Sequence, residues 1–172
     1  MDSNTLTIPT TTSLPALGRG RTHHVIDIEN LLALTRGERI EPVAYQLYRA
    51  VAGVGPSDLL TVAADRSRVF EVRTAFPGAE VRFGTGPDGA DRALLDAIDV
   101  QLLARRFDTL VIGSGDHLFW DLAYRARSVG LKVVVVSRPK GLSRLLASQA
   151  DEVIAMASLV DGQLPPHLTT AA

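Results

Sequence analysis

Short runs of β-branched and other apolar residues alternate along the chain with longer stretches of helical periodicity. Six such runs predict strands: His24–Asp27, Leu59–Ala63, Glu80–Phe83, Thr109–Ile112, Val133–Val136 and Val153–Met156. Strands separated by helices are typical of βαβ units, so we predict an α/β fold with a mostly parallel sheet of five or six strands. Such sheets bind ligands outside the carboxyl ends of their strands, which is where the chemistry should lie.

The helices are predicted from apolar spacing and from residues that begin or end a helix. Residues 91–106 predict the longest helix, because Leu94, Ile98 and Leu102 recur every four residues. The first crossover is predicted to be broken after Asn30, with a new helix begun by Glu41-Pro42, because proline suits the first helical position. Two further helices are predicted over residues 68–75 and 117–129.

Both ends of the chain differ from its middle. Residues 1–20 are rich in Thr, Ser and Pro and show no apolar periodicity, so they are predicted to be a disordered leader. Residues 161–172, which include Pro165-Pro166, are predicted to be a flexible tail. The remaining segment, 21–160, is predicted to be one domain, as its size and the 46% hydrophobic content of the 172-residue chain suggest.

Composition excludes several classes of function. The formal net charge of −1 gives no overall attraction to nucleic acid or to an anionic membrane, so a site that binds anions must arise from local segregation of charge. The absence of cysteine excludes disulfides, thiolate zinc sites and cysteine nucleophiles. No apolar run approaches the ~20 residues that span a bilayer, and no signal-peptide pattern opens the sequence, so a cytoplasmic protein is expected.

Carboxylates follow two of the predicted strands and precede the longest predicted helix. Asp27 ends the first strand, Asp116 follows the fourth through Gly-Ser-Gly, and Asp91 follows a glycine-rich loop. These positions lie at one edge of a parallel sheet, where like charges need a compensating cation, and divalent ions with oxygen ligands are suitable. Helix capping by Asp91 or Asp116, and pairing of Asp96 with Arg92, are alternatives that the sequence leaves open.

Four segments carry a family resemblance: Asp27-Ile28-Glu29-Asn30, Gly89-Ala90-Asp91 with Asp96, Ser114-Gly115-Asp116-His117-Leu118-Phe119, and the strand that begins at Gly130. Together they resemble the NYN family of PIN-like nucleases over residues 23–157. The resemblance implies a three-layer α/β/α sandwich, PIN-like in topology, and a ribonuclease acting on RNA with Mg²⁺ or Mn²⁺. It implies metal binding by Asp27, Asp91, Asp96 and Asp116, with Asn30 and Ser114 as orienting groups in the catalytic site.

Cations that follow the predicted strands are candidates for contacts to phosphate. These candidates are Arg66, Arg68, Arg82, Arg138 and Lys140, with His117 beside the last aspartate. The alternative is that these cations lie on solvated surfaces and have no role in binding. Aromatic residues make up only 5% of the chain, and Phe119 and Trp120 are expected in the core rather than against bases.

Some features of the sequence fit functions other than metal-dependent RNA cleavage. Leu118 stands where the family often has a second acid, which keeps open a PIN-like RNA-binding or assembly module with little or no catalysis. The glycine spacing at 84, 86 and 89 fits a dinucleotide fingerprint, but it follows the third strand rather than the first. A phosphoacceptor receiver domain is disfavoured because no aspartate ends the third strand. An apolar helix face on a small sheet domain also leaves room for a homodimer.

Overall fold

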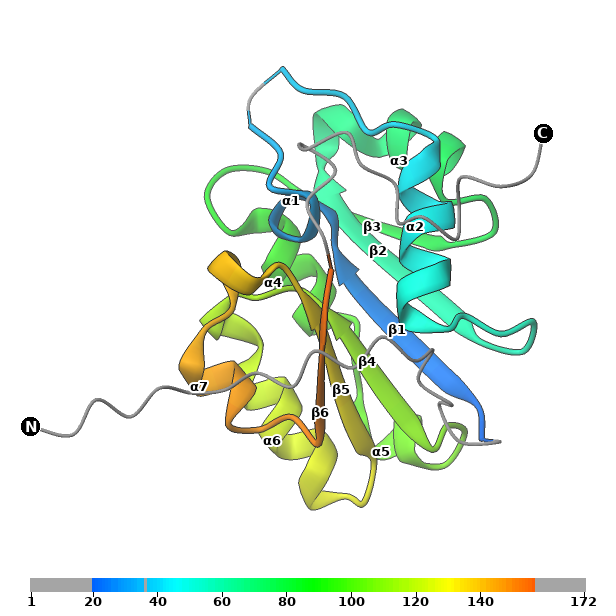
Figure 1. Cartoon of the computed structure of the whole chain (residues 1–172), viewed down its shortest axis with the longest axis vertical. Helices are drawn as coiled ribbons and strands as arrows, with labels where there is room; N and C mark the ends of the chain where they lie inside the picture. Colours follow the sequence, from blue (N-terminus) through cyan, green and yellow to red (C-terminus); the bar gives the residue numbers. More distant parts are fainter. Residues whose placement is uncertain (1–19, 36, 157–172) are drawn as a thin grey trace, which may run out of the picture.

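All six predicted strands form, and they join in one parallel sheet with the order β3-β2-β1-β4-β5-β6 (Figure 1). The computed structural model describes residues 20–35 and 37–156. The strands are β1 Thr22–Asp27, β2 Leu59–Asp65, β3 Glu80–Gly84, β4 Thr109–Gly113, β5 Lys132–Ser137 and β6 Glu152–Ala155. The predicted tail, and all of the predicted leader except Gly20, lie outside the described residues.

Helices cover both faces of the sheet, which confirms the predicted α/β/α sandwich. One core cluster packs α1 (Ile28–Leu32), α2 (Val43–Ala52) and α3 (Val69–Ala75) on the sheet. The other packs α4 (Gly89–Asp96), α5 (Val100–Ala104), α6 (Trp120–Ser128) and α7 (Arg144–Ala147) on the opposite face. Three short 3₁₀ helices follow strand ends: η1 Arg66–Arg68, η2 His117–Phe119 and η3 Pro139–Gly141.

The predicted helix over residues 91–106 is wrong as a single element, because the chain turns between α4 and α5. Asp99 stops the first helix and caps the second, accepting the backbone N–H groups of Gln101 at 2.9 Å and Leu102 at 3.1 Å. An aspartate side chain that bonds nearby backbone competes with helix continuation. As a result, Leu102 leaves the buried stripe and is 52% exposed, whereas Leu94 is fully buried.

The sheet order places β1 and β4 side by side at its centre. Ile26 of β1 pairs with Gly113 of β4, so the residues that follow these strands emerge together. The chain moves outward through β2 and β3 on one side and through β5 and β6 on the other. This change of direction creates a crevice at the carboxyl ends of the two central strands.

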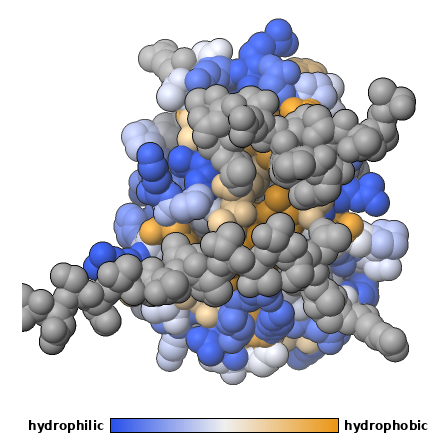
Figure 2. All heavy atoms as spheres, viewed as in Figure 1, coloured by the Kyte–Doolittle hydropathy of each residue, from blue (hydrophilic) through white to orange (hydrophobic). Residues whose placement is uncertain are grey.

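The outer surface is mostly polar in the view of Figure 1. Hydrophilic side chains dominate the periphery, and hydrophobic ones gather near the centre of the view (Figure 2). None of the helices in the described residues has the length and apolarity that crossing a bilayer requires.

Candidate active site

Asp27 ends β1 and turns directly into α1. Its Oδ1 accepts the backbone N–H of Asn30 at 3.3 Å, so it caps the helix. Its Oδ2 accepts the Ser114 hydroxyl at 3.1 Å. The side chain is therefore held from both sides, and only 4% of the residue is exposed.

The loop after β4 presents Asp116 beside Asp27. Ser114 is fully buried, and its hydroxyl oxygen accepts the Asp116 backbone N–H at 3.1 Å while its proton goes to Asp27. Asp116 in turn caps η2 by accepting the Leu118 N–H at 2.9 Å, and its Oδ1 lies 3.0 Å from His117 Nδ1. Asp116 therefore does cap a helix, which was one alternative for its role. Both of these contacts use Oδ1, so Oδ2 is available for other partners.

Asn30 ties together the three strand ends that surround the site. Its side-chain oxygen accepts the Gly115 N–H at 2.9 Å, and its backbone oxygen accepts Nε and Nη2 of Arg138 at 3.1 and 3.0 Å. A Cβ at Gly115 would overlap the carbonyl oxygen of Gly141, so the loops after β4 and β5 can approach this closely only with glycine there. Asn30 therefore links α1 to the loop after β4 and to Arg138.

Asp91 enters the site from the first turn of α4. The start of this helix is pressed against the end of β3, where a Cβ at Gly84 would overlap the carbonyl oxygen of Gly89. The half-buried Asp91 carboxyl comes within hydrogen-bonding reach of Asp27. The predicted convergence of Asp27, Asp91 and Asp116 at one edge is what the structure contains.

A cavity of about 490 Å³ opens over these residues, and six acids line it: Asp27, Glu29, Asp65, Asp88, Asp91 and Asp116. Among the described residues on its wall, Arg138 is the only cation. Asp65 is not among the predicted site residues, although it ends β2 just as Asp27 ends β1, so its position at a strand end is a signal that identifies it. Asp88 sits in the glycine-rich loop with a left-handed backbone (φ 55°), a signal that sequence spacing does not carry.

Burial and neighbouring negative charge raise the pKa of the two central carboxyls. Burial, and then the nearby Asp91 charge, raise the pKa of Asp27 to about 8, although the bonds from Asn30 and Ser114 act in the opposite direction. The pKa of Asp91 is raised by burial and by the charges of Asp116 and Asp88. Within the described part of the chain, neither Asp27 nor Asp91 is paired with a lysine, arginine or histidine.

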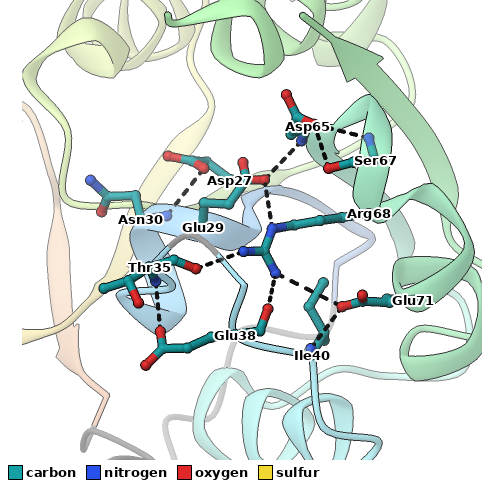
Figure 3. Close-up of polar contacts among 10 residues, drawn as sticks. All are labelled: Asp27, Glu29, Asn30, Thr35, Glu38, Ile40, Asp65, Ser67, Arg68 and Glu71. Atoms are coloured by element: carbon teal, nitrogen blue, oxygen red, sulfur yellow. Dashed lines mark hydrogen bonds and ion pairs between the residues drawn. The ribbon is translucent and has the colours of Figure 1, made fainter. Parts of the chain in front are cut away.

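Arg68 does not reach the cavity as a phosphate ligand, which corrects the sequence-based prediction. Figure 3 shows its guanidinium enclosed by polar groups of the chain itself. It donates to the backbone oxygens of Thr35 (2.8 Å) and Glu38, and it pairs with Glu29 at 3.5 Å and Glu71 at 3.8 Å. Arg68 therefore anchors the segment after α1 and the Glu29 carboxylate at the edge of the site.

Other predicted site residues lie farther out. Asp96 is exposed at the end of α4 and does not line the cavity, because its position on the helix faces away from that of Asp91. Arg82 pairs with Glu80 on the edge strand β3 and is also absent from the cavity wall. Arg66 and Lys140 are exposed in η1 and η3, at the edge of the sheet that carries the site. The exposed His117 adjoins the site through Asp116.

The donor set was tested for its fit to a divalent cation. In residues 20–35 and 37–156, no three His, Asp or Glu side chains are placed close enough to form a complete metal-binding group. Two carboxyls in contact nevertheless lie in a cavity whose wall is dominated by acids, and hard oxygen donors of this kind suit Mg²⁺ or Mn²⁺. Asp27, Asp91 and Asp116, which line the same cavity, therefore offer oxygen donors of the kind that such a cation takes.

The fold and sequence were compared with known proteins. The family model described as NYN domain matches residues 24–157, well over half of the chain. The crystal structure of a protein of unknown function from Vibrio parahaemolyticus RIMD 2210633 matches with a TM-score of 0.57 and 20% identity, over 80% of this chain and 93% of that one. At that identity the likeness concerns the fold alone. No curated protein matches the chain.

Proposed function

Because the chain belongs to the NYN domain family, a PIN-like ribonuclease family, we propose that it is a divalent-metal-dependent ribonuclease that hydrolyses RNA phosphodiester bonds at the aspartate cluster. The observation that carries the proposal is the gathering of the Asp27 and Asp91 carboxyls on one cavity wall. Burial and neighbouring negative charge raise the pKa of the buried Asp27 and of the half-buried Asp91, so each needs either a proton or a nearby cation. A shared divalent cation meets that need and supplies the chemistry.

We assign cation binding to Asp27, Asp91 and Asp116, and phosphate contacts to Arg138 and His117. When bound, Mg²⁺ or Mn²⁺ would lower the pKa of a coordinated water and offset charge on the phosphate. Asp27 must lose its proton to the solvent for this, so its raised pKa makes cation binding tighter at higher pH. Asp96, which is exposed outside the cavity, has no role in this assignment.

Ser114 and Asn30 act by holding the acids in place. The Ser114 hydroxyl fixes the rotamer of Asp27 and the backbone of Asp116 together. Asn30 fixes the Gly115 N–H between them and holds the Arg138 guanidinium at the cavity wall. Groups that orient the ligands of a metal typically change affinity or activity 10- to 100-fold when removed.

The test is a cleavage assay on structured and unstructured RNA with Mg²⁺ and with Mn²⁺. Wild-type protein is expected to cleave only when a divalent ion is present, and Asp27→Asn, Asp91→Asn and Asp116→Asn should each abolish cleavage without unfolding the chain. Asp121→Asn is the matched control, because Asp121 is exposed on α6 and pairs only with Arg125 in the described structure. A folded wild-type protein that binds RNA but leaves it intact would instead support the alternative, a catalytically inactive RNA-binding module.

A further inference from the structure

Charge is distributed unequally around the cavity. On the side of β2 and β3, the cavity and its neighbouring hollow present five acids, here termed the acidic rim: Glu29, Glu38, Asp65, Glu71 and Asp88. Arg68 on this side is occupied by backbone oxygens and by Glu29 (Figure 3). Among the described residues that line the cavity and this hollow on the β2 and β3 side, Arg68 is the only cation. A phosphate chain lying across the acidic rim would be repelled.

The opposite side of the cavity is basic. Between Asp121 and Asp151 the sequence has no acidic residue and six cations. Arg125, Arg127 and Lys132 pair with Asp121, Asp151 and Glu152, respectively. The other three, Arg138, Lys140 and Arg144, form the basic rim, and in the described residues none of them is paired with a carboxylate.

The segment that carries the basic rim packs directly against the loop that carries Asp116. The Ser143 N–H donates to the Gly115 oxygen at 2.8 Å, and α7 packs against η2. Arg138 reaches into the cavity wall, whereas Lys140 and Arg144 are exposed in η3 and α7. The basic rim therefore extends from the exposed surface at Lys140 and Arg144 to Arg138, which lines the acidic cavity.

Two aromatic side chains lie next to this region on the exposed face of α6. Trp120 is 37% exposed and Tyr124 is 54% exposed, with ring centroids 6.3 Å apart. Phe119 is fully buried, as predicted, but the expectation that Trp120 belongs to the core is wrong. Trp120 follows η2 directly and lies only four residues after Asp116 in the sequence. An exposed indole beside a phosphate-binding surface suits stacking with an unpaired base.

Building on the proposed function, we propose that single-stranded RNA enters the cavity across η3 and α7. Its phosphates contact Arg138, Lys140 and Arg144, and a base stacks on Trp120. Unpaired rather than duplex RNA is the partner because a base can reach the indole only when it is not stacked within a helix. The acidic rim excludes the opposite path, so the strand approaches the acids from one side.

The test measures binding of a fluorescein-labelled oligo-uridine of about 12 nucleotides, within the site sizes usual for single strands. The protein carries Asp91→Asn and Mg²⁺ is present, so that the RNA stays intact. The variants are Lys140→Ala/Arg144→Ala, and Arg49→Ala/Arg105→Ala as the charge-matched control. Arg49 and Arg105 are exposed near the carboxyl ends of α2 and α5, away from the cavity wall. Arg138 is left intact because it also holds Asn30.

Loss of two phosphate contacts should reduce the magnitude of the slope of log K against log salt by about 1.4, with the control unchanged. Trp120→Leu keeps apolar bulk without a ring and should weaken binding about 5- to 150-fold, whereas Trp120→Phe should retain most of the affinity. Melting temperatures verify folding. The proposal is overturned if the two double variants lose equal slope, if Trp120→Leu binds as the parent does, or if a matched duplex binds more tightly.

These outcomes are separable from those of the proposed function. RNA binding that depends on the basic rim without any cleavage by wild type would leave the entry path standing and remove the nuclease. Metal-dependent cleavage by wild type, with RNA binding unchanged in the basic-rim variants, would support the nuclease and overturn the entry path.

Discussion

The Ser114 hydroxyl lies 3.1 Å from Oδ2 of Asp27 and joins the ends of the two central strands. The same hydroxyl oxygen accepts the Asp116 backbone N–H. One buried side chain therefore positions two acids that are 89 residues apart in the sequence, numbered 27 and 116. Its only donatable proton goes to Asp27, which favours the charged form of that carboxyl.

Ser114→Ala should reduce cleavage about 10- to 100-fold, the usual range for groups that orient metal ligands. Because the lost bond stabilised the Asp27 carboxylate, the pKa of Asp27 should rise further, and the acidic limb of the pH–rate profile should move to higher pH. The measurement is kcat/KM against pH at a fixed, subsaturating Mg²⁺ concentration, because the cation and the proton compete for Asp27. Ser148→Ala, which removes an exposed hydroxyl bonded to backbone, is the control; equal profiles for the two variants would contradict the role.

Stability should depend on pH through Asp27. In the unfolded chain an aspartate has a pKa near about 4, and in the fold the pKa of Asp27 is raised to about 8. The folded state therefore binds more protons in this interval, and the free energy of unfolding should fall as pH rises from about 4 to about 8. Asp91 on α4, Glu29 on α1 and Asp116 before η2 face this group, and each adds negative charge when ionised.

Asp27→Asn removes that titration and supplies an amide that can donate to Asp91. The variant should be more stable than wild type at pH 8, by a few kcal/mol because each pKa unit corresponds to about 1.4 kcal/mol, with little difference near pH 4. The free energy of unfolding of the variant should still fall somewhat with pH, because the pKa of Asp91 is also raised. Urea unfolding with and without Mg²⁺ checks this: the ion should stabilise wild type more than the variant. A wild type that gains stability from pH 4 to 8 relative to Asp27→Asn would refute it.

Asp91 and Asp96 lie on one helix and should respond differently to the same substitution. Asp91→Asn should abolish metal-dependent cleavage, because its carboxyl contacts Asp27. Asp96→Asn should leave cleavage and the affinity for Mn²⁺ unchanged, because Asp96 is exposed outside the cavity. Parallel titrations of the two variants with Mn²⁺, following activity and bound metal, decide between them. A loss of metal affinity in Asp96→Asn would restore it to the site.

Arg68→Met should destabilise the fold by about 1–3 kcal/mol. The substitution leaves the Thr35 oxygen without its donor and the Glu29 and Glu71 carboxylates without their shared cation. Arg68→Lys should recover little, because a single ammonium cannot reproduce the planar fork that serves two carbonyls and two acids. Urea unfolding measures the loss. Since Arg68 is not a phosphate ligand here, the salt dependence of RNA binding should stay unchanged in folded Arg68→Lys protein.

Hydrophobic runs predicted all six strands. The central strands β1 and β4 are buried on both faces and leave a plain apolar signature, whereas the edge strands β3 and β6 are partly exposed. The acids at the ends of β1 and β4 followed from the same pattern, since parallel strands bring their carboxyl ends to one edge. The break at Asp99 did not follow, because Leu94, Ile98 and Leu102 keep a four-residue period across it and only the capping geometry ends the helix.

Side-chain roles were harder to predict than positions. Arg68 and Arg138 both follow strands at the correct edge, yet Arg68 turns inward to Glu29 while Arg138 lines the cavity. The difference depends on which carbonyls each guanidinium meets, and those come from distant loops. Asp65 occupies a strand end like Asp27, and its place on the cavity wall depends on the neighbouring order of β1 and β2.

The central pairing of β1 with β4 has a consequence for how the molecule is made. A ribosome releases Asp27 and Asp91 well before Asp116, and β1 lacks its inner neighbour until β4 has been synthesised. A partial chain therefore cannot assemble all three acids. The cavity that these acids line is completed only when β4 and the loop after it have joined β1, in the second half of the chain.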